Sequence, residues 1–182
     1  MRQLTIRAIL GIVAVLAATA VLTLRWLPDR STPLVSVHSG KCVSVFDGNI
    51  EEARAFQLGC TDQSDNRWYL QKIVEDDVGG APYRIVNISN SKCLSISDEL
   101  FSGARVIVQR SCANGNKKDQ LWIFDLDEDR GNGWIYGQFV NMQKWHCLDI
   151  NGGELADGAP VIEWPCAQGS NQRFRVPKEA IS

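Results

Sequence analysis

The sequence predicts an all-β domain built from three repeated units of about 50 residues each. Six cysteines fall into three pairs with internal spacings of 18, 19 and 19 residues, and the first members of the pairs lie 51 and 54 residues apart. Each first cysteine is followed by an apolar, a polar and an apolar residue, the period of a half-buried strand. Because one such unit is too small to bury its own apolar face, the three are expected to close on a shared core.

An apolar segment at the N-terminus stands apart from these repeats. Arg2 and Arg7 precede an uncharged, mainly apolar run over residues 8–24. The pattern predicts one hydrophobic helix within residues 1–27, used as a signal peptide or as a membrane anchor, and either use places the rest of the chain outside the cytoplasm. The run is short for a bilayer span, and residues 18–20 offer a cleavage motif, so both interpretations stay open. Membrane contact is expected only through residues 8–24.

Polar segments bound the predicted domain. Residues 28–33 hold two prolines and are interpreted as a linker, and residues 177–182 as a tail. The domain is therefore expected over residues 34–176. Its repeats are expected over about 34–83, 84–137 and 138–176.

The six cysteines are expected to form disulfides, because their number is even and the chain carries an export pattern. Six cysteines allow fifteen connectivities, but three equivalent units would each close their own pair. No C-x-x-C motif or histidine cluster favours metal binding. The predicted bridges, each worth about 3 kcal/mol in the chain-entropy model, are Cys42–Cys60, Cys93–Cys112 and Cys147–Cys166.

An aromatic residue follows the second cysteine of every unit. Trp68, Trp122 and Phe174 lie 8, 10 and 8 residues after it, and we expect all three to fill the shared core. Hairpin-like stretches connect the units, with turns at residues 79–80 and 131–133, which are rich in glycine. The acidic run just before the second turn lacks the glycine and glutamate of a calcium loop and is interpreted as a hairpin tip.

These motifs resemble the ricin-B (R-type) lectin family. In the third unit, residues 147–150 read CLDI, residues 161–166 read VIEWPC and residues 171–174 read NQRF. They match the family's Cys-Leu-Asp-Val, apolar-Gln-x-aromatic-x-Cys and Asn-Gln-x-Trp segments. The resemblance extends over residues 34–176 and implies a β-trefoil, with twelve strands arranged as a six-stranded barrel and a hairpin cap.

The resemblance also implies a sugar site in each unit that keeps the family's residues. A carboxylate accepts hydrogen bonds from two sugar hydroxyls, and an aromatic ring stacks on the apolar face of the sugar. In the third unit these residues are Asp149 and Trp164, joined by Asn171 and Gln172. Ile162 replaces the family's glutamine and removes one hydrogen bond. The neighbouring Trp145 and His146 are expected to flank this site.

The first two units lack the residues that the family uses. Both have serine in place of the aspartate, and leucine or arginine in place of the ring. We expect neither unit to bind sugar in the family manner. The residues at the aspartate, ring and asparagine positions are Ser44, Leu58 and Asp65 in the first unit and Ser95, Arg110 and Asp119 in the second.

Together these observations predict a carbohydrate-binding protein, a lectin with one sugar site in the third repeat. The alternative is a sugar-blind β-trefoil that acts as a protein-interaction or toxin accessory subunit, similar to subunits of bacterial cytolethal distending toxins. The sequence holds no Gly-x-Ser-x-Gly or His-Glu-x-x-His motif, and we predict no enzyme activity, no cofactor and no metal. A net charge of -2 argues against nucleic acid as a partner and leaves a glycan or a protein.

Overall fold

The computed structural model describes residues 30–46, 50–73 and 81–181. The hydrophobic segment over residues 1–27 and the turn at residues 79–80 lie outside the described residues. The described part consists of strands, turns and short 3-10 helices, so the all-β prediction is confirmed there. None of its helices is long and apolar enough to cross a membrane.

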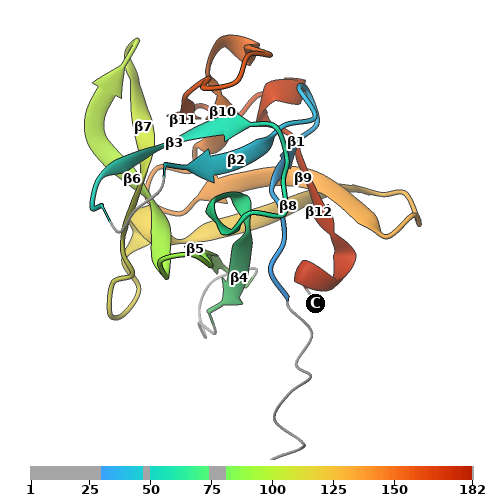
Figure 1. Ribbon diagram of the computed structural model, residues 1–182, viewed down its shortest axis with the longest axis horizontal. Coiled ribbons are helices and arrows are strands. Elements are labelled where there is room, and N and C mark those ends of the chain that lie inside the picture. The colour runs from blue at the N-terminus through green and yellow to red at the C-terminus, as the bar shows by residue number, and fades with distance from the viewer. Residues whose placement is uncertain (1–29, 47–49, 74–80, 182) are drawn as a thin grey trace, which may run out of the picture.

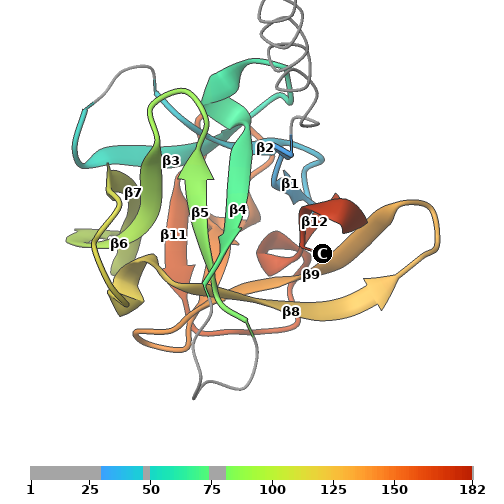
Figure 2. The ribbon, with the colours of Figure 1, turned by 90° about the horizontal axis from the view of Figure 1, so that it is seen from below.

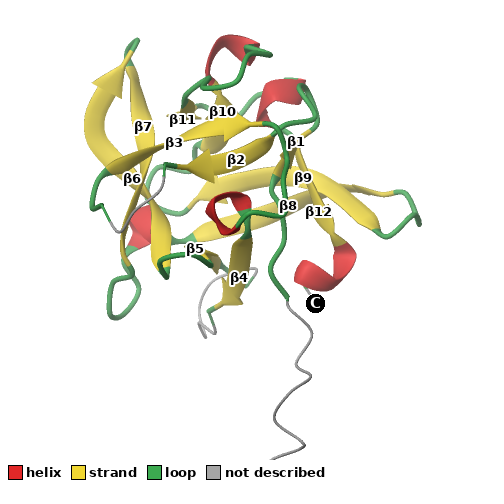
Figure 3. Ribbon diagram, viewed as in Figure 1, coloured by secondary structure: helices red, strands yellow, loops and turns green. Residues whose placement is uncertain are grey.

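Twelve strands form one sheet in the described part of the chain (Figures 1 and 3). The strands are β1 (Val35–Ser36), β2 (Cys42–Val45), β3 (Ala53–Leu58), β4 (Trp68–Lys72), β5 (Tyr83–Asn87), β6 (Lys92–Phe101), β7 (Ala104–Ser111), β8 (Trp122–Asp129), β9 (Trp134–Asn141), β10 (Cys147–Ile150), β11 (Val161–Trp164) and β12 (Phe174–Pro177). The 3-10 helices are η1 (Ser64–Asn66), η2 (Lys118–Gln120), η3 (Asn151–Gly153), η4 (Ser170–Gln172) and η5 (Lys178–Ala180).

The sheet closes on itself, because its outermost strand in the pairing order, β10, also pairs with β9. The first and last strands of the chain, β1 and β12, pair with each other. Figure 2 shows β4 and β5 side by side, with the β8–β9 hairpin crossing the lower edge of the molecule. Closure of this kind leaves few free strand edges and surrounds one apolar core.

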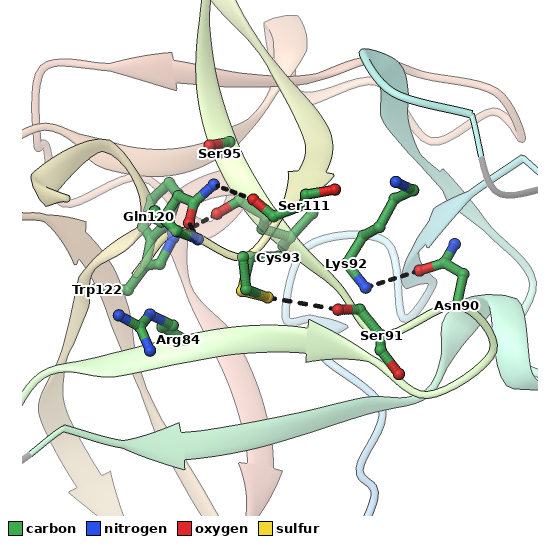
Figure 4. The surroundings of a disulfide bond; sticks show 12 residues. Arg84, Asn90, Ser91, Lys92, Cys93, Ser95, Ser111, Gln120 and Trp122 are labelled. Carbon is green, nitrogen blue, oxygen red and sulfur yellow. Dashed lines mark hydrogen bonds between the residues drawn. A yellow bond between two sulfur atoms is a disulfide. The ribbon is translucent and has the colours of Figure 1, made fainter. Parts of the chain in front are cut away.

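The sequence repeat is a structural repeat. The hairpins β2–β3, β6–β7 and β10–β11 each join the two cysteines of one unit, and each predicted disulfide is present with its Cα atoms 5.0 Å apart. The three bridges indicate a domain that folds outside the reducing cytoplasm. Figure 4 shows the second bridge, with the Cys112 sulfur beside the Ser91 carbonyl and Gln120 donating to the Ser111 carbonyl. The cross-strand partners at the first cysteine are Cys42 with Leu58, Cys93 with Arg110 and Cys147 with Trp164.

The recurring aromatic residues fill the core, as predicted. Trp68, Trp122 and Phe174 are fully buried. The indole N–H of Trp68 donates to the Val43 carbonyl at 2.9 Å, and that of Trp122 donates to the Leu94 carbonyl at 3.3 Å. Each acceptor directly follows a first cysteine, so the hydrogen bond ties the aromatic residue to the disulfide hairpin of its own unit and leaves no buried indole donor unpaired.

Contacts of the fold continue past both ends of the expected domain. Thr32 pairs with Trp68 through two backbone hydrogen bonds of 2.7 and 2.8 Å. After β12, η5 carries the chain to Ile181, whose carbonyl accepts a 2.9 Å hydrogen bond from the Tyr83 hydroxyl. Residues assigned to the linker and the tail therefore help to close the barrel.

The acidic run lies at the β8–β9 hairpin, where glycines turn the chain at residues 131–133 with positive φ. Asp127 pairs with Arg173 at 2.8 Å, and Asp129 pairs with Lys178 at 2.6 Å. The acidic side chains thus hold the residues directly before and directly after β12 against the hairpin through ion pairs.

We expect Glu51 to make stability depend on pH. Its carboxylate pairs with Lys92, whose side chain is only 7% exposed, and accepts hydrogen bonds from Ser111. These contacts, led by the Lys92 hydrogen bond, lower the Glu51 pKa from 4.5 to about 2. Since this pKa is depressed by folding, the stabilisation is complete above pH 4.5 and is lost as pH falls toward 2. Because the carboxylate is half exposed, its contribution is about 1 kcal/mol.

Urea unfolding of Glu51→Gln and wild type between pH 7 and pH 2 measures this contribution. The variant should be less stable at pH 7, and the two curves should converge at the acid end. Glu154→Gln, at an exposed carboxylate, is the control and should follow wild type throughout. A Glu51→Gln deficit that stays constant down to pH 2 would contradict the assignment.

Candidate functional site

Asp149 lies on β10 with its side chain on the face opposite the core. Leu148 and Ile150 on either side of it point into the core and are fully buried. Because side chains alternate along a strand, Asp149 points the other way, opposite Ile162 of β11. It is nevertheless only 3% exposed, since Asn171 and Gln172 of η4 cover it.

Two amides hold the Asp149 carboxylate in place. The Asn171 Nδ2 donates to both Asp149 oxygens at 3.0 Å, and the Gln172 Nε2 donates to Oδ2 at 2.7 Å. Gln172 is itself fixed: it donates to the Pro165 carbonyl at 3.1 Å and accepts from the Ala167 N–H at 2.7 Å. The structure therefore brings together three of the four predicted site residues.

This arrangement leaves the carboxylate with acceptor capacity. An ionised carboxylate has about four lone-pair directions. Oδ2 of Asp149 accepts two N–H groups, whereas Oδ1 accepts only the Nδ2 of Asn171. Oδ1 therefore has capacity for one further donor beside the two amides, and a second would have to displace Asn171, which is half-buried.

Burial shifts the ionisation of this carboxylate. Desolvation raises the pKa of Asp149 above its ordinary value of 3.8, and the hydrogen bonds from Gln172 and Asn171 only partly oppose the rise. Ile162 contributes an apolar neighbour where a polar amide would have favoured the charged form. The site therefore holds a desolvated carboxylate that gains from any additional hydrogen-bond donor.

Trp164 supplies an exposed ring on the same face. It lies two residues beyond Ile162 on β11, so its side chain leaves the sheet on the side of Asp149. It is 45% exposed, whereas Phe174 of the same unit is fully buried. Phe174 therefore lies in the core, as predicted, and the Trp164 ring lies at the surface.

His38, which the sequence did not predict as part of the site, connects η4, which covers Asp149, to η3. Its Nε2 lies 2.8 Å from the carbonyl oxygen of Gly153 in η3, and its Nδ1 lies 2.9 Å from the Ser170 hydroxyl in η4. Since the Gly153 carbonyl can only accept, Nε2 carries the proton. His38 is separated from these partners by 115 and 132 residues, and no local motif connects it to them.

The equivalent position in the second repeat is filled by an ion-pair network. Arg110, which occupies the ring position, pairs with Glu52 and donates to the Ile96 carbonyl at 3.0 Å. It also lies 3.5 Å from Asp119, which accepts a 3.2 Å hydrogen bond from Ser95. The residues that replace the aspartate, the ring and the asparagine thus bond to one another and to a glutamate from the preceding repeat.

The first repeat has neither a ring at the position of Trp164 nor such a network among the described residues. Leu58 occupies the ring position, and the Ser44 hydroxyl is buried without a hydrogen-bond partner among the described residues. Asp65 stands at the position of Asn171. This repeat instead exposes the ring of Phe46, whose centroid lies 4.2 Å from that of Phe56, the cross-strand partner of Ser44, so the three repeats differ in the chemistry they present.

Comparison with known proteins places the chain in a family and a fold. The family of ricin-type beta-trefoil lectin domain-like proteins matches residues 23–109, 72–164 and 118–181. No curated protein sequence matches the chain.

Three solved structures illustrate the structural similarity. The designed threefold-symmetric protein ThreeFoil is 26% identical with a TM-score of 0.67, and the match covers 82% of this chain and 99% of ThreeFoil. The exo-beta-1,3-galactanase 1,3Gal43A from Clostridium thermocellum is 25% identical with a TM-score of 0.66, over 83% of this chain but only 30% of the enzyme. The earthworm R-type lectin C-half in complex with GalNAc is 18% identical with a TM-score of 0.58, over 81% and 97% of the two chains, and at that identity shows the fold alone.

Proposed function

Since this chain belongs to the ricin-type beta-trefoil lectin domain-like family, we propose that it binds carbohydrate through one site, in its third repeat. The observation that carries the proposal is the Asp149 carboxylate, oriented by Asn171 and Gln172 on the face where the Trp164 ring is exposed. A pyranose needs this combination, because it has an apolar C–H face and a rim of hydroxyls.

Each residue has a distinct role in the proposed site. Trp164 stacks on the apolar face of the sugar, and Asp149 Oδ1 accepts a sugar hydroxyl. Asn171 lies at the rim of the site, where it can bond a second hydroxyl. Gln172 is buried with both ends of its amide bonded, so it acts by orienting the carboxylate rather than by touching the sugar.

A single shallow site of this kind is expected to be weak. Ile162 cannot supply the hydrogen bond of the family's glutamine, and the other two repeats lack the ring. We expect a dissociation constant around 1 mM, about -4 kcal/mol. Effective attachment to a glycan surface would then require several copies, which residues 1–27 would provide if they anchor the chain in a membrane.

Trp164→Ala tests the site directly. Losing the stacking surface should weaken glycan binding about tenfold to a hundredfold, because a buried aromatic contact is worth about 1.5–3 kcal/mol. The full chain, held in a detergent without a sugar headgroup, would be applied to a glycan array. Leu58→Ala, at the equivalent position of the first repeat, is the matched control and should bind as wild type does. Equal binding by Trp164→Ala and wild type would remove the claim for this site.

Binding should also fall in mildly acidic solution. The ionised Asp149 accepts the sugar hydroxyl, and its pKa lies above 3.8 because of burial. Protonation therefore begins at a higher pH than for an exposed aspartate, and affinity should decline before pH reaches 3.8. Array binding measured from pH 7 to pH 3.5 checks this, with circular dichroism to show that the fold persists. Affinity that stays constant over this range would mean that the carboxylate does not take part.

A sugar-blind protein-interaction or toxin accessory subunit is the second candidate. The closed network around Arg110 in the second repeat and the leucine in the first favour it, because two of three sites lack a ring. A wild-type chain that binds no glycan on the array but captures a defined toxin or hydrolase subunit would support it. For either candidate we propose no enzymatic activity, cofactor or metal, and turnover of a glycoside by the purified chain would contradict this.

A further inference from the structure

One turn recurs in all three repeats and demands an unusual backbone conformation. It lies two residues before the first cysteine of each pair. The residue there has a φ of 71° in Gly40, 60° in Ser91 and 59° in Trp145. Glycine adopts this left-handed region freely, whereas a bulky aromatic residue rarely does.

The three turns are equivalent in detail. In each, the N–H of the left-handed residue donates at 2.9 Å to the carbonyl of the residue four earlier. Its own carbonyl oxygen lies 3.6, 3.4 and 3.6 Å from the second sulfur of the local disulfide. The fold therefore accepts glycine, serine or tryptophan in one backbone geometry, and nothing in that geometry requires an aromatic ring.

The ring of Trp145 gains little from packing. It is 58% exposed, more than Trp164. A strained tryptophan that leaves most of its ring in solvent is not explained by stability, and strain of this kind collects at functional positions. It occurs in the repeat that also holds Asp149, Asn171 and Trp164.

Trp145 and Trp164 lie on either side of one disulfide. Trp164 is the cross-strand partner of Cys147, and Trp145 precedes Cys147 by two residues. The carbonyl oxygen of Trp145 lies 3.6 Å from the Cys166 sulfur, and Cys166 follows Trp164 by two residues, so both tryptophans adjoin the Cys147–Cys166 bridge. Since the Cα atoms of that bridge are 5.0 Å apart, the two tryptophans are near enough for neighbouring units of one oligosaccharide to contact both.

The surroundings of the two rings are polar. Gln143 and Lys144 before Trp145, and Gln168 after Cys166, are all exposed. Two separate rings among amides and an amine suit a ligand with alternating apolar faces and hydroxyls better than a continuous apolar protein surface.

We propose that Trp145 is a second stacking platform, so that the ligand of the third repeat is an oligosaccharide of at least two units. One unit sits on Trp164 and Asp149, and the next lies against Trp145. This inference rests on the proposed function, and it assigns to that site a chain-like substrate rather than a single sugar.

The test is the dependence of affinity on chain length. The full chain, in a detergent without a sugar headgroup, is titrated against immobilised series of one to four units built from galactose, glucose, mannose, xylose or N-acetylglucosamine. Wild type should bind two units about tenfold more tightly than one in the series it recognises. Trp145→Gly, which installs the residue of the first repeat, should remove this gain and leave the affinity for one unit unchanged. Its thermal midpoint should stay level or rise, since glycine relieves the backbone.

Ser91→Gly provides the matched control, because it makes the same backbone change in the second repeat without removing a ring. It should keep the full gain with chain length. Wild-type affinity that does not depend on length, or a Trp145→Gly variant that keeps the gain, would overturn the inference while leaving the single-sugar site intact. Absence of binding to every series would instead defeat the proposed function and this inference with it.

Discussion

Asp149→Asn should bind glycan about thirtyfold more weakly than wild type. The carboxylate would be replaced by a neutral amide, and a hydrogen bond to a charged acceptor contributes about 2 kcal/mol. One end of the new amide would also present donors to Asn171 and Gln172, which donate themselves. The variant should keep its fold at neutral pH. Since burial raises the pKa of Asp149, ionisation of this group opposes folding above the pKa of the unfolded chain, and the substitution removes that penalty.

Dose-dependent binding to a glycan array measures the loss, and thermal unfolding checks the fold. Asp65→Asn is the control, because it makes the same chemical change in the first repeat, where leucine stands at the position of Trp164. We expect this control to bind glycan normally. Asp149→Asn binding at the wild-type level would show that the carboxylate belongs to the scaffold and not to a ligand site.

Gly137→Ala should destabilise the domain by about 3 kcal/mol or more. Gly137 lies on β9, and an added Cβ would come within 2.2 Å of the Asp125 carbonyl oxygen and 3.0 Å of the Phe124 ring. The first of these atoms belongs to the backbone of β8, so it cannot move aside without breaking the pairing of the two strands. For a domain of this size such a loss lowers the thermal midpoint by about 10 °C.

Gly59→Ala is the matched control for this substitution. A Cβ at Gly59 would meet no atom of the described residues within 4 Å, and the backbone there is not left-handed. Urea unfolding should place this control within about 0.5 kcal/mol of wild type. A Gly137→Ala variant that unfolds together with the control would mean that β8 and β9 can separate locally at little cost.

Much of the fold could be predicted from the sequence, because the same pattern of cysteines and strands occurs three times. Three pairs of cysteines in register determine which strands face each other, and the disulfides and the buried Trp68, Trp122 and Phe174 agree with that prediction. Asp149 and Asn171 could be brought together for the same reason, since Asp149 lies two residues after the first cysteine and Asn171 three residues before the core aromatic, offsets that are the same in all three units.

Contacts between repeats could not be predicted in this way. The spacing of residues within a unit does not indicate which loop of one repeat contacts the neighbouring repeat. Glu52 of the first repeat bonds to Arg110 of the second, and His38 of the first bonds to Gly153 and Ser170 of the third. Each of these contacts depends on loop conformations that have no periodic signal in the sequence.

The hydrogen bonds of His38 connect residues from the two ends of the domain. Its imidazole lies near the start of the described residues, and the hydroxyl that it meets lies close to their end, just before β12, the strand that pairs with β1 to close the barrel. A C-terminally shortened chain that ends before Ser170 would keep the cysteines of its first two hairpins but lack this contact. If the third repeat binds a ligand as proposed, we expect binding to require the complete domain, because His38 from one end and Ser170 from the other must both be present.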